Sequence, residues 1–141
     1  MSLEEVKKRF VEEVKLRAYD DKYIDKNEER EILQIAIQQG IGVEAARGAL
    51  VQVCNTQGYV VESQALASVK KVIETFAEND GVISQKEFND AVTICKKECQ
   101  GKRNDQQCKR MVIELIEDNS FKTKQGFFNH WYDNVKKEVG V

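Results

Sequence analysis

Proline is absent from this 141-residue chain, histidine occurs once, and glycine is modest at 8 residues. Because no proline interrupts a helix interior, the composition favours long helices over a strand-rich fold. No apolar run approaches the roughly 18 residues that a membrane-spanning helix needs. Residues 1–8 are charged where a signal peptide has its apolar region. These absences predict a cytoplasmic, all-α protein with no transmembrane segment.

Neither sign of charge dominates the chain. Charged residues make up 33% of it and the formal net charge is −2, with both signs interspersed. Such a surface gives no reason to expect a nucleic acid or an anionic membrane as the main partner. The length is that of one domain with a single core. We therefore expect one domain, residues 1–141, whose partner is an unidentified protein.

Apolar residues recur at helical spacing along most of the chain, which predicts a bundle of about seven helices. The clearest stripe has Cys108, Met111, Val112 and Leu115 at i, i+3, i+4 and i+7. The predicted helices cover about residues 3–19, 43–55, 63–78, 85–100 and 123–139, with two more between Asp25 and Gly40 and between the breaks at 101–105 and 117–120. Residues 57–63 contain a glycine-centred turn with a short β-prone run, for which a structured loop is expected and brief strand pairing is the alternative.

Two similar turns organise this pattern. Residues 77–88 combine a helix end, a tight turn at Asp80-Gly81, an apolar Ile83 and the start of a new helix. Residues 18–28 repeat the arrangement at a constant offset of 59 positions. The offset predicts an internal pseudo-symmetry, with pseudo-repeats at about 6–62 and 65–120 and a C-terminal aromatic helix at 123–139.

The second turn matches the later half of an EF-hand loop, where ligands at positions 1, 3, 5, 7, 9 and 12 surround a glycine at position 6. With Gly81 at position 6, Phe76 falls at position 1 and cannot bind calcium. The candidate side-chain ligands of the second turn are Glu78, Asp80, Ser84 and Glu87. In the first turn Lys22 replaces the glycine, and the candidates are Asp21, Asp25 and Glu28. One interpretation is therefore a weakly bound calcium or magnesium ion.

The other interpretation is that both turns only cap helices. Asp25 with Glu28, and Ser84 with Glu87, have the spacing of a capping box, in which each side chain accepts a hydrogen bond from the other residue's backbone amide. Aspartates near a helix N-terminus also favour the helix dipole without any metal. The residues alone leave both interpretations open.

The paired Ala-x-x-Asp-Gly-x-Ile-x-x-x-Glu turns, in an all-helical chain of this size, resemble the TerB-like tellurite-resistance family. The second turn matches through Ala77, Asp80, Gly81, Ile83 and Glu87, and the first through Ala18, Asp21, Ile24 and Glu28. The resemblance implies a helical, non-enzymatic protein associated with metal or chemical stress and with membrane-linked complexes. It also implies metal-ligand roles for Asp21, Asp25, Glu28, Asp80 and Glu87. Lys22 and the C-terminal aromatic helix depart from the family pattern.

Four cysteines and one histidine raise the alternative of a zinc or redox site. Cys95 and Cys99 share a helix face, Cys108 begins the next helix, and Cys54 or His130 is available as a fourth ligand. Structural zinc sites prefer short Cys-x₂₋₄-Cys knuckles in loops. These thiols lie instead on apolar stripes, where free cysteine behaves as a small hydrophobe. No nucleophile–base pair is recognisable, so no enzymatic activity is expected.

The aromatic residues near the C-terminus have two interpretations. Phe127, Phe128, Trp131 and Tyr132 fall on the predicted last helix, where a terminal helix closes a bundle by burying aromatic area. Phe127 and Tyr132 lie on different faces of that helix, however, so one of them is alternatively an exposed docking surface.

The sequence therefore favours a TerB-like, non-enzymatic interaction module, with weak divalent-metal binding at the acidic turns and a link to metal or chemical stress. One alternative is an EF-hand-like divalent-cation sensor. A second alternative is a zinc- or redox-responsive thiol protein that uses Cys95, Cys99 and Cys108.

Overall fold

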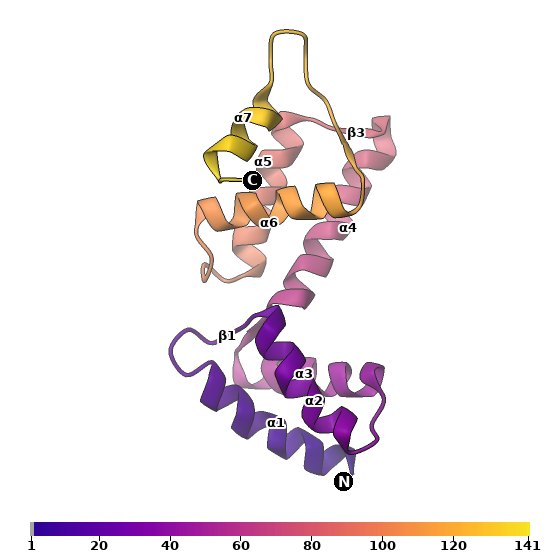
Figure 1. The fold of residues 1–141 in the computed structure, drawn as a ribbon, viewed down its shortest axis with the longest axis vertical. Helices are drawn as coiled ribbons and strands as arrows, with labels where there is room; N and C mark the ends of the chain where they lie inside the picture. The colour runs from indigo at the N-terminus through magenta and orange to yellow at the C-terminus, as the bar shows by residue number, and fades with distance from the viewer. Residues whose placement is uncertain (1) are drawn as a thin grey trace. The chain divides into compact units, whose positions relative to one another are not determined.

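A computed structural model describes residues 2–141, and within them seven α-helices and four two-residue strands form. The elements are α1 Leu3–Arg17, β1 Tyr23–Ile24, α2 Lys26–Gln38, α3 Val43–Gln57, β2 Val60–Val61, α4 Glu62–Asp80, β3 Val82–Ile83, α5 Gln85–Glu98, α6 Asp105–Asp118, β4 Lys122–Thr123 and α7 Trp131–Glu138. The predicted all-α bundle is confirmed (Figure 1). No helix within residues 2–141 is long and apolar enough to cross a membrane.

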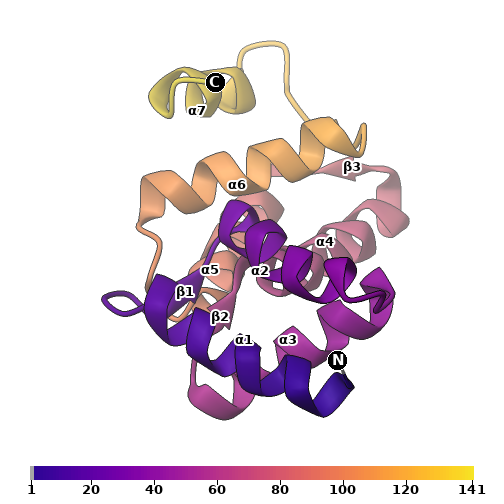
Figure 2. The same ribbon diagram turned by 60° about the horizontal axis from the view of Figure 1, so that its bottom comes forward.

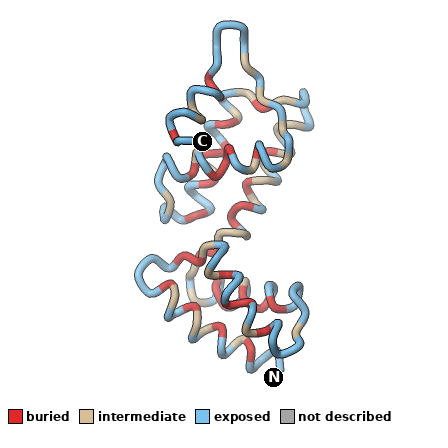
Figure 3. Tube along the Cα trace, in the orientation of Figure 1, coloured by how far each residue is buried: buried red, intermediate tan, exposed pale blue. Residues whose placement is uncertain are grey.

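The chain forms two compact units, Met1–Gln64 and Ala65–Val141, and the division falls in the first turn of α4. In the first unit α1, α2 and α3 pack against one another. Their buried stripes share one core, which contains Val6, Phe10, Val14, Ile24, Ile32, Ala36, Leu50 and Cys54. In the second unit α5 packs on α6, and α6 contacts α7. Figure 3 shows the buried positions recurring once per turn along these helices.

Short parallel strands join the turns in each unit. β1 pairs with β2 through Tyr23↔Val60 and Ile24↔Val61, and the two lie side by side in Figure 2. β3 pairs with β4 in the same way. The loop predicted at 57–63 therefore contains a strand. Two residues are too few to show the alternation of apolar and polar side chains that identifies a strand in a sequence.

The two related turns share a residue with positive φ although one lacks glycine. Gly81 has φ 78° and Lys22 has φ 52°, both in the left-handed region. In each turn the preceding aspartate accepts a hydrogen bond from the amide two residues later. The distances are 3.1 Å from Tyr23 N to Asp21 Oδ1 and 3.2 Å from Val82 N to Asp80 Oδ1. Asp side chains favour such turns because they hydrogen-bond their own backbone.

The aromatic helix predicted over 123–139 is wrong in its first half. Thr123 belongs to β4, and α7 begins only at Trp131. The indole Nε1 of Trp131 donates to the Lys124 carbonyl at 2.7 Å, which holds the preceding chain in a loop. Trp131 and Tyr132 are buried and pack on Phe88, at ring-centroid distances of 5.4 Å and 6.3 Å. Phe127 and Phe128 lie on that loop, outside the core.

We predict opposite stability changes at the two turns. Gly81→Ala lowers the free energy of unfolding by about 1–2 kcal/mol, because a Cβ is disfavoured at positive φ. Lys22→Gly raises it by up to about 1 kcal/mol by relieving the same cost. An added Cβ at Gly81 meets no atom within 4 Å, so the effect is conformational. Denaturant unfolding followed by circular dichroism measures both.

Gly48→Ala is the control. It lies within α3, also has no atom within 4 Å of an added Cβ, and is expected to stabilise by about 0.5–1 kcal/mol. Equal destabilisation by alanine at Gly48 and Gly81 would contradict the left-handed assignment.

Candidate functional site

The three candidate ligands of the first turn are engaged with the backbone. Asp25 and Glu28 form a capping box on α2: Glu28 N donates to Asp25 Oδ1 at 2.8 Å, and Asp25 N donates to Glu28 Oε1 at 3.1 Å. Asp21 closes the preceding turn through Tyr23 N. Burial raises the pKa of Glu28, and the nearby carboxylates of Asp25 and Asp21 add to this rise. The predicted cap is therefore present, and it engages one oxygen of each of the two candidate ligands Asp25 and Glu28.

The second turn has the same chemistry. Ser84 and Glu87 form a capping box on α5, with hydrogen bonds of 3.1 Å from Glu87 N to Ser84 Oγ and 2.9 Å from Ser84 N to Glu87 Oε1. α4 continues to Asp80, so Glu78 and Asp80 belong to a helix and not to a ligand loop. Asp80 turns back to the amide of Val82.

Within residues 2–141 no three His, Cys, Asp or Glu side chains converge closely enough to hold a metal ion. The seven predicted ligands are thus not brought together as one site. Three or more oxygen ligands from such side chains are what a protein calcium site ordinarily requires. Metal binding by the turns stays a prediction, and helix capping is the role that the geometry displays.

The cysteines are buried free thiols. Cys95, Cys99 and Cys108 gather where α5 meets α6, and Cys54 belongs to the core of the first unit. Contact with the Cys99 thiol and burial raise the pKa of Cys95, and burial raises that of Cys108. Burial, with a contribution from Glu29, raises the pKa of Cys54 to about 12. Neutral buried thiols pack as small hydrophobes and are poor nucleophiles or metal ligands.

His130, the other candidate for a thiol-based metal site, is on the surface. It is the N-cap residue of α7, and its ring Nδ1 lies 4.0 Å from Asp133 Oδ2. Its side chain is 61% exposed, whereas Cys95, Cys99 and Cys108 are fully buried. The structure thus does not place His130 in the apolar setting of the thiols.

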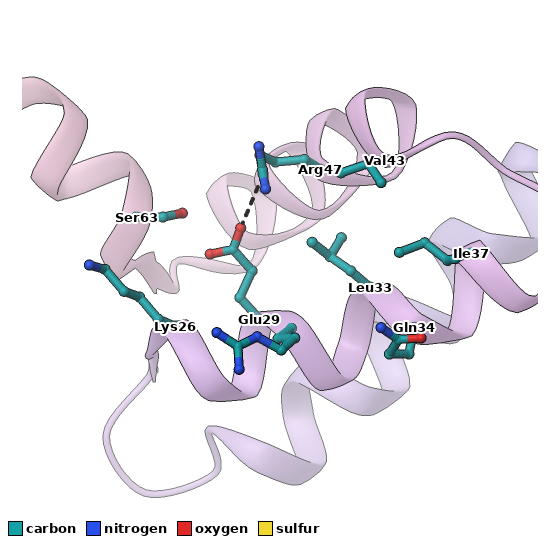
Figure 4. A pocket seen from close by; sticks show the side chains of 9 residues that line it. Lys26, Glu29, Leu33, Gln34, Ile37, Val43, Arg47 and Ser63 are labelled. Atoms are coloured by element: carbon teal, nitrogen blue, oxygen red, sulfur yellow. Dashed lines mark ion pairs between the residues drawn. The ribbon is translucent and has the colours of Figure 1, made fainter.

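A pocket of about 330 Å³ between α2 and α3 is the feature that the sequence analysis missed (Figure 4). α2 contributes most of its lining, α3 contributes Val43 and Arg47, and Ser63 closes one end. The lining residues of α2 are Lys26, Glu29, Arg30, Leu33, Gln34 and Ile37. The pocket thus combines three cationic side chains, one carboxylate and an apolar wall.

Glu29 is the buried charge of this pocket. It is 5% exposed, and among the described residues no other charged or polar side chain is classed as buried. Its Oε1 lies 3.4 Å from Nε of Arg47, whose side chain is half exposed. Figure 4 shows the carboxylate directed from α2 toward Arg47, with Lys26 and Ser63 on the other side. A carboxylate so far removed from water depends on such a partner.

The sequence carried one signal for this pocket. Glu29 stands four residues before Leu33 and seven before Ala36, so it continues the buried stripe of α2. A carboxylate on an apolar stripe indicates a buried charge that needs a partner. The partner itself was not predictable, because Arg47 is on another helix.

Glu28→Gln is expected to leave stability at pH 7 unchanged or slightly higher. Glutamine serves at the same position of a capping box, as Gln107 does with Asn104 on α6. The folded-state pKa of Glu28 is raised, so the charged form is the less favoured one when the protein is folded. As the pH falls through that pKa, the free energy of unfolding of wild type therefore rises relative to that of Glu28→Gln.

Unfolding free energies of both proteins from pH 7 to about pH 4, the region where a free glutamate titrates, measure the difference. Glu28→Ala is the control that loses the cap at every pH. If the free energy of unfolding of wild type instead increases relative to Glu28→Gln toward pH 7, the Glu28 charge stabilises the fold and the prediction is wrong.

A double-mutant cycle between Glu29 and Arg47 should give a favourable coupling of about 1 kcal/mol, above that of a fully exposed pair because the carboxylate is buried. The cycle uses Glu29→Gln and Arg47→Met in urea unfolding at pH 7. Arg30→Met is the control: it lines the same pocket, and among the described residues it has no carboxylate within ion-pair distance. Equal coupling of Glu29 to both arginines would contradict the pairing.

Comparison of the chain with family models, with curated proteins and with solved structures finds no match. The resemblance to the TerB-like family accordingly stays a prediction that depends on the residues of the two turns.

Proposed function

We propose that this protein is a non-enzymatic interaction module, TerB-like in kind, whose α2–α3 pocket holds an acidic and apolar segment of a partner protein. The observation that carries the proposal is the composition of the pocket, with three cations beside an apolar wall. An association with metal or chemical stress is what the resemblance implies for its biological setting.

The apolar wall is available to a ligand. Leu33 forms the buried floor, while Ile37 and Val43 are 38% and 44% exposed. Covering Ile37 and Val43 with an aliphatic side chain removes apolar surface from water, which is the usual main source of binding free energy. A partner residue such as leucine has the size for this position.

The cations select the charge of the ligand. Lys26, Arg30 and Arg47 line the pocket, and Glu29 neutralises one of them, which leaves a local excess of positive charge. Arg47 and Arg30 present planar guanidinium groups, which bind carboxylates in a bidentate manner. An acidic residue next to an aliphatic one therefore complements this pocket better than a basic or neutral segment.

The test is an amide NMR titration with the peptide acetyl-Glu-Leu-Leu-Glu-amide. We expect saturable shifts on α2 and α3 around Leu33 and Arg47. Arg30→Glu should weaken the affinity for the peptide at least tenfold, because a hydrogen bond to a charged group contributes about 1.5–3 kcal/mol. Lys15→Glu is the control, because it makes the same change of charge at an exposed position of α1.

The analogue acetyl-Lys-Leu-Leu-Lys-amide should not bind. Equal binding of both peptides, or shifts that Arg30→Glu leaves unchanged, would exclude the pocket as a charge-selective site. Titration of the same sample with calcium, magnesium and zinc separates the alternatives. Saturable shifts at Gly81 and Lys22 support the cation sensor, and shifts at Cys95 to Cys108 support the thiol protein.

A further inference from the structure

The segment between β4 and α7 carries two almost wholly exposed phenylalanines. Phe127 is 88% exposed and Phe128 is 93% exposed, the highest values among the large hydrophobic residues on the surface of the described chain. Their rings contact each other edge to face, with centroids 5.1 Å apart. Figure 1 shows this segment as a long loop that projects from the second unit. Exposed adjacent aromatics of this kind mark an interaction surface.

The base of this loop is fixed to the second unit. Lys124 N donates to the Ile83 carbonyl at 2.8 Å, and the Trp131 indole donates to the Lys124 carbonyl at 2.7 Å. Asp133 N donates to Gln125 Oε1 at 3.3 Å. The loop is therefore held at both ends, and Phe127 and Phe128 lie between the two fixed ends. In this arrangement the two rings are exposed, whereas Trp131 and Tyr132 are buried.

The charge around the loop is positive. Between Asp118 and Asp133 the chain has no acidic residue, whereas Lys122 and Lys124 are both exposed there. Two of the flanking acidic side chains face a cation or a histidine. Glu117 is 2.7 Å from Lys136, and Asp133 lies 4.0 Å from His130. Two exposed lysines thus lie shortly before the phenylalanines in the chain.

We propose that the 124–130 loop is a membrane-contact site, in which Phe127 and Phe128 enter the interface of an anionic bilayer while Lys122 and Lys124 face the lipid headgroups. Apolar residues beside lysines are the pattern of segments that bind at membrane surfaces without spanning them. Exposed lysines near the surface are attracted to acidic lipids. A projecting loop with exposed phenylalanines suits a bilayer, which needs no preformed pocket, better than it suits a folded protein surface. This inference is independent of the α2–α3 pocket.

The test is flotation of the full chain with phosphatidylcholine vesicles that contain or lack phosphatidylserine. We expect weak, reversible binding that increases with phosphatidylserine and falls with salt, because one short apolar anchor gives only marginal affinity alone. Phe127→Ser with Phe128→Ser should reduce the partition coefficient at least tenfold. Lys122→Glu with Lys124→Glu should reduce it at least tenfold on acidic vesicles, since each lysine accounts for roughly fivefold.

Matched controls come from α1 and the turn that follows it. Leu16→Ser with Tyr19→Ser removes two other exposed hydrophobic side chains, which are 75% and 82% exposed. Lys8→Glu with Lys15→Glu makes the same change of net charge on α1. Both control proteins should bind vesicles like wild type. Because all these positions are exposed, circular dichroism should show every variant folded.

Two outcomes would overturn the proposal. The first is wild-type protein that stays unbound on acidic vesicles at lipid concentrations of about 1 mM, the range where a weak anchor binds. The second is vesicle binding that Phe127→Ser with Phe128→Ser does not weaken. If sedimentation velocity shows self-association that Phe127→Ser with Phe128→Ser abolishes, while vesicles are not bound, the loop is a contact between copies of the chain.

Discussion

The left-handed turn that precedes a capped helix is the constraint on which each unit depends. At Asp21-Lys22 and at Asp80-Gly81 an aspartate fixes the turn, one residue takes positive φ, and the next two residues form a strand. A capping box then starts the following helix. Each strand delivers one fully buried isoleucine, Ile24 or Ile83. The turn therefore sets where the chain enters the core and the direction in which it leaves.

This dependence explains why the acidic residues of the turns are informative and yet ambiguous. A carboxylate that accepts backbone amides at a helix N-terminus has the same position in sequence as one that binds calcium in a helix–loop–helix motif. The sequence records only residue type and spacing, and a glutamate at the end of the motif serves both roles. In the structure Asp25, Glu28 and Glu87 turn toward amides of their own helix, which is the capping role.

Local periodicity made most of the fold predictable. The first five predicted helices begin and end within about two residues of α1 to α5, because each carries an apolar stripe and a cap or glycine that can be recognised without tertiary context. The predictions were weaker where contacts between distant segments decide the structure. β2 and β4 depend on partners more than thirty residues away, and the helix predicted from Thr123 is replaced by a loop that the Trp131 indole holds in place.

The candidate sites likewise differ in whether their contacts join residues close in the sequence or residues on different helices. Capping boxes connect residues three apart and were predictable. The α2–α3 pocket needs Glu29 and Arg47 from different helices, so only its buried carboxylate left a sign in the sequence. Net charge is also an average, and a chain with a balance of −2 contains an acid-free stretch around Phe127 and Phe128. Recognition by a membrane or a partner depends on the field within about a Debye length of the contact, so the local distribution outweighs the total.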